Sequence, residues 1–261
     1  MTVLSRATAG LLSLAALAAV ALNAPSGARA DSATFSPEQK QAIEKIMKDY
    51  LVANPEVLLE VQSILETKME KQAAEKTKAA LADNAKEIYR STGSPVAGKA
   101  DGDITVTEFF DYNCGFCKRS FPEVAKLIST DPNLRVVFKE MPILSKGSEE
   151  ASRVALAAKL QGKYWEVHQG LFDNKGQNNE ATALRIAEKA GLDMARLKAD
   201  MNGTEVNAEL KSAKELAVRM GINGTPHFLV GDRSIAGAPD TLLSQLQSDI
   251  ADMRKAGCSY C

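Results

Sequence analysis

The chain has 261 residues, of which 45% are hydrophobic and 25% charged, a composition that excludes a disordered or collagen-like protein and allows one or two domains with a sizeable core. Its 32 basic and 33 acidic residues give a formal net charge of -1. Because there is no basic excess to attract phosphates, we expect no nucleic-acid partner. The 4 cysteines are too few for a disulfide-scaffolded miniprotein, yet they form two Cys-x-x-Cys pairs, Cys114 with Cys117 and Cys258 with Cys261.

The first thirty residues have the pattern of a secretory signal peptide. Arg6 is followed by an apolar stretch over residues 11–22 and then by Ala28-Arg29-Ala30. The apolar stretch is shorter than the roughly 20 residues that a membrane-spanning helix needs. We therefore predict cleavage after Ala30 and export to the periplasm, an oxidising compartment in which disulfides persist.

Residues 31–92 are expected to form a helical region. Ser36, Pro37 and Gln39 provide an N-cap hydroxyl, a proline at the first helical position and a capping-box partner. Asn54 and Pro55 are expected to begin a second helix that continues to about Arg90, on the order of 50 Å at 1.5 Å per residue. Each helix carries an apolar stripe at helical spacing, made of Ile43, Ile46, Met47, Tyr50 and Leu51 in the first and Leu58, Val61, Leu65 and Met69 in the second.

Two interpretations of these stripes remain open. They pack on the domain that follows, or they pack against copies of themselves, because two short helices alone rarely bury so much apolar surface. We favour the second interpretation and expect residues 31–92 to be an oligomerisation and stalk segment of a homo-oligomer.

The pattern changes after a small, polar linker at residues 91–95. Residues 104–110 are β-branched and aromatic and predict a strand; a helix over about 117–129, kinked at Pro122, and a strand over 134–139 follow. Short connections between these elements favour a βαβ unit with parallel strands. Further along, we expect a helical insert over about 148–221, a hairpin of strands 227–230 and 234–236, and a last helix over about 239–255. The class is α/β, with one domain over residues 93–261.

Cys114 follows the predicted strand and opens the predicted helix in the sequence Cys-Gly-Phe-Cys. A sulfur at that position lies beside unsatisfied backbone N–H groups and the positive end of the helix dipole. In such motifs the cysteine pKa falls from about 8.5 to roughly 3.5–7.5, and the thiolate is the species that attacks disulfides. Lys118 and Arg119 add positive charge that favours the thiolate. We therefore predict that Cys114 attacks, that Cys117 resolves the mixed disulfide, and that Phe116 presents an apolar contact beside the reactive sulfur.

Structural explanations of the cysteines compete with this chemistry. A zinc site is disfavoured, because the gap between Cys117 and Cys258 far exceeds the spacing of about 15–20 residues in compact zinc ribbons. A purely structural disulfide between Cys114 and Cys117 is disfavoured too, because a bridge across Cys-x-x-Cys constrains little of the unfolded chain. For Cys258 and Cys261 a surface disulfide or a frayed end is favoured, with a relay to the Cys114 pair or a copper(I) site as alternatives. We expect no cofactor and no resident metal.

Two segments together resemble the DsbA family of thioredoxin-fold thiol-disulfide oxidoreductases. They are residues 108–119, which contain Cys-Gly-Phe-Cys, and residues 224–228, which read Gly-Thr-Pro-His-Phe. The resemblance covers about residues 94–255. It implies a thioredoxin fold with a helical insertion, preceded here by the N-terminal helical segment.

The resemblance also implies roles for three residues outside the cysteine motif. Pro226 would follow a cis peptide bond in a loop that faces the active-site cysteine. Thr225 would offer its backbone groups to an extended substrate segment. Glu108 would be a buried acid below the disulfide that modulates proton transfer from Cys117. The alternatives are an ordinary turn at residues 224–226 and a solvent-exposed strand carboxylate at Glu108.

The residues between the cysteines bear on the direction of the reaction. The family's strongest oxidase has histidine where this chain has Phe116, and Gly-Phe is closer to the Gly-Tyr of periplasmic disulfide isomerases. A helical oligomerisation region ahead of such a domain also resembles the trimeric ScsC proteins. We expect a disulfide isomerase or reductase that acts on secreted proteins with cysteines and is reset by a membrane redox partner of the DsbD or DsbB type. A dithiol oxidase and a copper-binding thiol chaperone remain alternatives.

Overall fold

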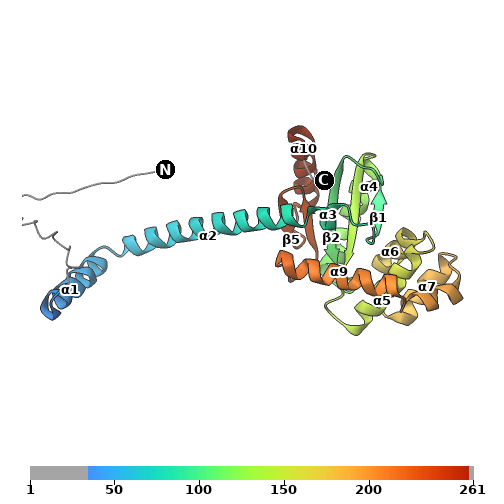
Figure 1. Ribbon diagram of the computed structural model, residues 1–261, viewed down its shortest axis with the longest axis horizontal. Coiled ribbons are helices and arrows are strands. Elements are labelled where there is room, and N and C mark those ends of the chain that lie inside the picture. The colour runs from blue at the N-terminus through green and yellow to red at the C-terminus, as the bar shows by residue number, and fades with distance from the viewer. Residues whose placement is uncertain (1–34, 259–261) are drawn as a thin grey trace, which may run out of the picture. The chain divides into compact units, whose positions relative to one another are not determined.

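The structure is a computed structural model that describes residues 35–258, so the predicted signal peptide and Cys261 lie outside the described residues. Figure 1 shows the elements in chain order. The helices are α1 (Pro37–Ala53), α2 (Glu56–Asp83), α3 (Ala85–Tyr89), α4 (Gly115–Thr130), α5 (Lys146–Lys159), α6 (Tyr164–Asp173), α7 (Glu180–Lys189), α8 (Met194–Asp200), α9 (Thr204–Met220) and α10 (Leu242–Ala256). The strands are β1 (Val96–Gly98), β2 (Ile104–Phe110), β3 (Leu134–Glu140), β4 (His227–Val230) and β5 (Arg233–Ala236).

The chain divides into two compact units, residues 1–63 and 64–261. In the described part of the first unit, Ser36 and Gln39 form the predicted capping box: the Gln39 amide donates to Ser36 Oγ and the Ser36 amide donates to Gln39 Oε1. Asn54 ends α1 instead of capping α2, because its side-chain amide donates to the Tyr50 carbonyl. The helix α1 buries none of its residues.

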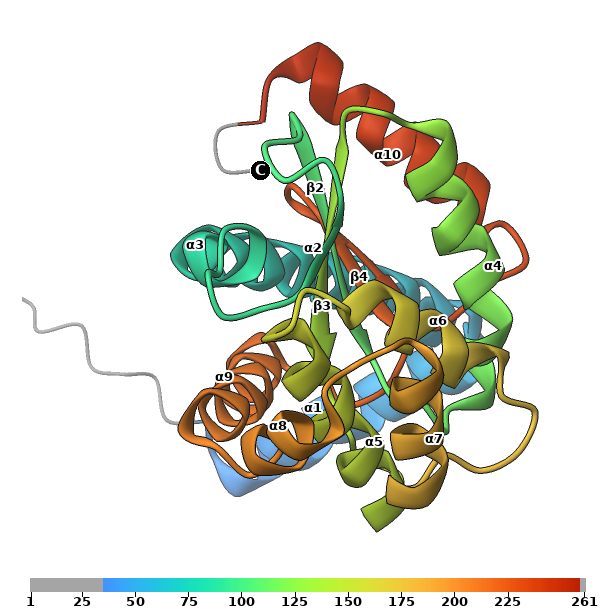
Figure 2. The same cartoon turned by 90° about the vertical axis from the view of Figure 1, so that its right-hand side faces the viewer.

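The second unit is built on a five-stranded sheet in the order β1-β3-β2-β4-β5. The strands β2 and β3 are parallel, which confirms the predicted βαβ unit, and β4 pairs antiparallel to β2 and to β5. The short edge strand β1 was not predicted; it pairs antiparallel to β3. Figure 2 shows α4 and α10 on one side of this sheet and α3 and α9 on the other. The thioredoxin-type fold with a helical insertion is therefore confirmed.

The strand β2 is buried on both faces, and its alternation divides the core in two. Ile104, Val106 and Phe110 belong to the larger cluster with residues of α4 and α10. Phe109 belongs to a second cluster with residues of α2, α3 and α9. Glu108 has the same parity as Phe110 and therefore faces the side that α4 covers. This register places a carboxyl group beneath the first turn of α4.

The expected continuous helix to Arg90 is interrupted at Asn84, where α2 ends and α3 begins. The Asn84 side-chain amide donates to the Ala80 carbonyl, and its side-chain oxygen accepts from Arg219. After this break Ile88 and Tyr89 are fully buried, and the Tyr89 hydroxyl donates to the Gly231 carbonyl at 2.6 Å. The expected domain boundary between residues 92 and 93 thus falls inside the second compact unit, residues 64–261. Residues before this boundary help to cover the sheet.

The remaining elements follow the predicted pattern with shifted ends. The helical insert consists of α5 to α9, and α4 begins two residues before the predicted start because its first turn includes Gly115 and Phe116. Pro122 lies inside α4. Among residues 35–258, no helix is both long and apolar enough to cross a membrane.

Candidate active site

Cys114 is the N-cap residue of α4, at the point where β2 delivers the chain to that helix. Its backbone is extended, with φ -74° and ψ 119°, and its carbonyl accepts the Lys118 amide at 3.0 Å. The Cys114 amide donates to the Asp111 carbonyl at 3.0 Å, which fixes the turn between strand and helix. The sulfur therefore lies at the helix N-terminus, as its sequence position predicted.

The surroundings of Cys114 stabilise its thiolate. They lower the pKa of Cys114 from 9.0 to about 5, chiefly through a hydrogen bond from the Cys117 thiol. The side chain of Thr225 and the backbone N–H groups of Cys117 and Phe116 add to this effect, while burial of the sulfur opposes it. Cys114 is thus an anion at neutral pH, the form that attacks disulfides.

Cys117 has the opposite character. It is fully buried, and both burial and the hydrogen bond to the Cys114 sulfur raise its pKa far above the ordinary value. The charge of Glu108 raises it further. Neither Cys114 nor Cys117 is in a disulfide, so the structure describes the reduced form of the pair.

Glu108 is buried, which excludes the alternative of a solvent-exposed strand carboxylate. Burial raises the pKa of Glu108 to about 8, and the negative charges of Cys114 and Glu140 contribute to the shift. Since Glu108 also raises the pKa of Cys117, its charge acts on the thiol that must lose a proton.

A second buried carboxyl, Glu140 at the end of β3, was missed by sequence reasoning. It accepts hydrogen bonds from the hydroxyls of Tyr112 at 3.0 Å, Tyr164 at 2.9 Å and Ser152 at 2.7 Å. Burial raises the pKa of Glu140 to about 8 despite these donors. Tyr112 also contacts Nδ1 of the buried His168 at 2.9 Å. The only available signal was a charged residue at the end of a buried strand, and its partners come from distant segments.

Thr225 and Pro226 lie opposite Cys114. The peptide bond between them is cis, as the family resemblance implied, and Cys114 Sγ donates to the Thr225 carbonyl at 3.2 Å. The Pro226 carbonyl accepts the Gly237 amide at 2.8 Å, so this loop is held by the segment that follows β5. The two segments on which the resemblance rests thus meet in space.

Phe116 is 56% exposed beside the reactive cysteine, and the Arg119 guanidinium lies 4.8 Å from the centroid of its ring. Arg119 also donates to the Ala238 carbonyl at 2.8 Å. Lys118 donates from Nζ to the carbonyls of Asn174 and Gly176, both at 2.9 Å. Beyond any charge that they contribute, these two cations tie α4 to neighbouring loops.

An apolar groove of about 630 Å³ lies between the loop after β3 and the helix α9. The loop is joined to the active-site turn, because the amides of Ile143 and Leu144 donate to the Asp111 carboxylate at 2.9 and 3.0 Å. Sequence reasoning missed this groove, because the loop after β3 and the helix α9 are far apart in the chain and only the fold brings them together. Its apolar lining residues are Met141, Pro142, Ile143, Leu210, Ala217, Val218 and Ile222.

The second cysteine pair lies at the C-terminal end of the described chain. The Cys258 sulfur is in a disulfide, whereas Cys261, the other half of the predicted pair, lies outside the described residues. Within residues 35–258 no cluster of three or more histidine, cysteine, aspartate or glutamate side chains could hold a metal ion.

Comparisons with known proteins agree with this architecture. A family model described as DSBA-like thioredoxin domain matches residues 105–250, and a second, described as Copper resistance protein ScsC N-terminal domain, matches residues 39–72. Disulfide bond formation protein D of Bacillus subtilis is 27% identical over 163 residues, which cover 57% of this chain and 72% of that protein. The Na(+)/H(+) antiporter NhaA 1 of Salinispora arenicola is 31% identical over 148 residues, but the match spans only 22% of the antiporter. This chain thus spans about a fifth of the antiporters that it matches.

Solved structures give the same result. A thioredoxin-like oxidoreductase from Silicibacter pomeroyi is 44% identical, with a TM-score of 0.62 over 65% of this chain and 97% of that one. The compact conformation of Proteus mirabilis ScsC is 27% identical, with a TM-score of 0.60 over 84% of this chain and 99% of that one. The second match covers more of this chain than residues 93–261 alone can supply, so it extends into the N-terminal helical region.

Proposed function

We propose a Cys114-based disulfide exchange for this chain, which belongs to the DsbA-like thioredoxin domain family and is a thiol-disulfide oxidoreductase of the DsbA and ScsC type. The observation that carries the proposal is the difference between the pKa values of the two cysteines. The pKa of Cys114 is lowered to about 5, whereas that of the buried Cys117 is raised. One sulfur is ready to attack, and the other stays protonated until a mixed disulfide has formed.

In the proposed reaction the Cys114 thiolate attacks one sulfur of a substrate disulfide. A new bond joins Cys114 to the substrate, and the other substrate sulfur leaves as a thiolate. Once Cys114 is no longer an anion, one of the charges that raised the pKa of Glu108 is gone, and Glu108 in its ionised form accepts the proton of Cys117, which then attacks the Cys114 sulfur. The substrate then leaves reduced by two electrons, and the Cys114–Cys117 pair is left as a disulfide. If another substrate thiol attacks first, the substrate is isomerised with no net electron transfer.

We propose that the substrates are secreted proteins with cysteines. The backbone of Thr225, beside the cis peptide and 3.2 Å from Cys114 Sγ, would pair with an extended substrate segment. The exposed ring of Phe116 and the apolar groove beside α9 offer contacts to apolar side chains of an unfolded chain.

We favour isomerase or reductase activity. The Gly-Phe pair between the cysteines supports this direction, and so do the exposed apolar residues of α1 and α2, which would bring several active sites together if the chain self-associates. A dithiol oxidase is the second candidate, because stabilising the Cys114 thiolate favours the reduced pair and so makes its disulfide a stronger oxidant. A copper-binding thiol chaperone would use the same two thiols.

We propose the periplasm as the compartment and a membrane protein of the DsbD or DsbB type as the redox partner. An isomerase must be kept reduced, so a DsbD-type reductant fits the favoured direction, while a DsbB-type oxidant fits the second candidate. The state of the pair in protein isolated from the periplasm distinguishes the two partners.

Two measurements test the proposal. The Cys117→Ser variant should accumulate a mixed disulfide with substrate that reductant releases, whereas Cys114→Ser should trap none; absence of the adduct in both would contradict the mechanism. The reduction potential of the pair, together with refolding of scrambled ribonuclease, then separates isomerase from oxidase. A parent protein that binds copper(I) through Cys114, so that Cys114→Ser loses the binding, but that shows no disulfide exchange would favour the chaperone.

A further inference from the structure

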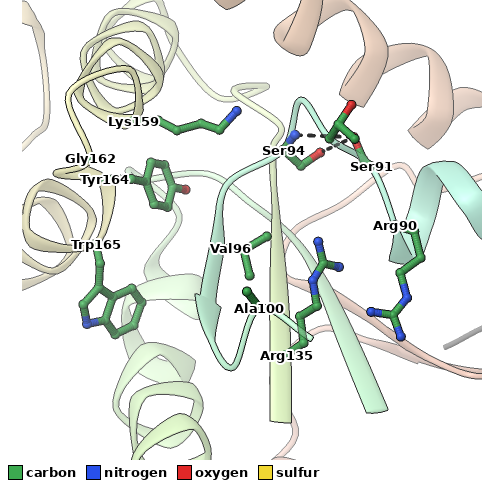
Figure 3. A pocket seen from close by; sticks show the side chains of 11 residues that line it. Arg90, Ser91, Ser94, Val96, Ala100, Arg135, Lys159, Gly162, Tyr164 and Trp165 are labelled. Atoms are coloured by element: carbon green, nitrogen blue, oxygen red, sulfur yellow. Dashed lines mark hydrogen bonds between the residues drawn. The ribbon is translucent and has the colours of Figure 1, made fainter. Parts of the chain in front are cut away.

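A cavity of about 560 Å³ opens between the linker after α3, the strand β3 and the start of α6 (Figure 3). Its lining does not include Cys114, Glu108 or Thr225, so it is separate from the cysteine site. It is lined by Arg90, Ser91, Thr92, Ser94, Val96, Ala100, Arg135, Lys159, Gly162, Tyr164 and Trp165.

The charge of this cavity has one sign. Arg90, Arg135 and Lys159 contribute three cations, and none of the described residues that line the cavity is acidic. In Figure 3, Lys159 reaches in from the α5 side, and the guanidinium groups of Arg90 and Arg135 lie on the opposite side. Three cations around one space repel one another unless an anion lies between them.

Arg135 carries the strongest evidence for a missing partner. Arg135 is buried, with only 7% of its surface exposed. Its Nε atom has no hydrogen-bond partner among the described residues. The guanidinium donates through Nη1 to the Tyr89 carbonyl, which leaves its charge uncompensated. Burial lowers the pKa of Arg135, and the like charge of Arg90 lowers it further.

The same strand shows how the chain treats another buried cation. Lys139 is fully buried, but its Nζ lies 3.9 Å from the Glu209 carboxylate and donates to Ser94 Oγ at 2.6 Å. Burying an unpaired charge is costly, and here an internal carboxylate offsets the cost. No ion pair joins Arg135 to a carboxylate in the described part of the chain, so a bound anion would supply its counter-charge.

The remaining lining suits an organic anion. Ser91 Oγ accepts the Ser94 amide at 3.4 Å and lies 3.0 Å from Ser94 Oγ, whose own proton goes to Glu209 Oε1 at 2.5 Å. Trp165 forms an aromatic part of the wall. The volume lies within the range of about 300–1,000 Å³ that is usual for small-molecule sites and exceeds the need of a single inorganic oxyanion.

We propose that this cavity binds a small organic anion, whose phosphate or carboxylate group lies between Arg90, Arg135 and Lys159 and whose apolar body contacts Trp165. The inference does not depend on the proposed disulfide chemistry. Ligand binding at this site and reactivity at Cys114 are therefore measured separately.

The full chain provides its own probe, because Trp165 is its 1 tryptophan. Titration with phenyl phosphate, benzoate or inorganic phosphate, at an ionic strength held constant with chloride, should change the Trp165 fluorescence in a saturable way. Phenyl phosphate should bind more tightly than inorganic phosphate, and its comparison with benzoate distinguishes a phosphate from a carboxylate ligand. If no probe gives a saturable change, the proposal is wrong.

Charge variants make the test specific. Arg90→Gln and Lys159→Gln should each weaken binding of the best probe by about tenfold, as expected for the loss of one charge-assisted hydrogen bond. Both side chains are less buried than Arg135, so the fold should survive. Lys126→Gln, which removes an exposed cation of α4 outside the cavity, should leave the affinity unchanged. Equal weakening by Lys126→Gln would show a nonspecific charge effect and overturn the site.

Discussion

The Sγ atom of Cys114 lies 3.2 Å from the carbonyl oxygen of Thr225, although 111 positions separate the two residues in the chain. This contact joins the helix N-terminus to the loop before β4. The carbonyl accepts from the thiol, whereas the Thr225 side chain stabilises the thiolate. The loop can therefore interact with the nucleophile in both protonation states.

The hydrogen bond from Cys117 is the largest cause of the lowered pKa of Cys114. We expect Cys117→Ala to raise the pKa of Cys114 from about 5 toward the ordinary value, because the donor is lost. Cys117→Ser keeps a hydroxyl donor and should raise it less. The ultraviolet absorbance of the thiolate, followed against pH, measures both variants. A pKa that stays near 5 in both variants would show that helix N–H groups, and not Cys117, stabilise the anion.

Thr225 offers a second, smaller change at the same sulfur. Thr225→Val keeps the shape and the backbone carbonyl but removes the side-chain hydrogen bond, so the pKa of Cys114 should rise by less than in Cys117→Ala. Thr225→Ser, which keeps the hydroxyl, is the matched control and should stay near the parent value. The rate of alkylation by iodoacetamide as a function of pH reports the shift, and an unchanged profile in Thr225→Val would refute this contribution.

Glu108 links the site to the pH dependence of stability. Burial raises the pKa of Glu108 from 4.5 to about 8, so the folded protein holds a proton that the unfolded chain releases. The contribution of Glu108 to the free energy of unfolding should therefore be highest below about pH 4.5 and fall as the pH rises toward 8, by a few kcal/mol in order of magnitude. Glu140 has a pKa shifted in the same direction and adds to this slope.

The Cys114 thiolate has the opposite slope, since its lowered pKa stabilises the folded state above pH 9 and that stabilisation is lost as the pH falls through about 5. The carboxyl effect is therefore measured in a Cys114→Ser background by urea unfolding at several pH values. There Glu108→Gln should reduce the fall in stability between about pH 4.5 and 8. A slope that this substitution leaves unchanged would show that Glu108 does not titrate as described.

The parts of this site that sequence reasoning found are encoded locally. The placement of Cys114 at a helix N-terminus follows from a strand pattern that runs directly into Cys-Gly-Phe-Cys. The cis bond before Pro226 and the burial of Glu108 came from family resemblance, because no local pattern states which face of β2 is covered.

The parts that were missed depend on long-range contacts. Alanines stand on both sides of Asn84, and the break there accompanies burial of Tyr89, whose hydroxyl donates to the distant Gly231 carbonyl. The Glu140 site needs donors from three separate segments, and β1 is a three-residue strand defined only by its pairing with β3. The spacing of apolar residues in the sequence does not predict contacts between such distant segments.

The apolar stripe of α1 supports the prediction that the chain self-associates. Ile46 and Tyr50 are 67% and 56% exposed, although helical spacing puts them on one face. In the chain without its predicted signal segment, Ile46→Asp should lower the mass measured by light scattering to that of a single chain, because a charge in an apolar interface is strongly unfavourable. Val52 is equally suited as a control, since it is apolar, 73% exposed and, at 100° per residue, on the opposite face of α1. Val52→Asp should leave the mass unchanged, and a parent protein that is already monomeric would exclude the oligomer.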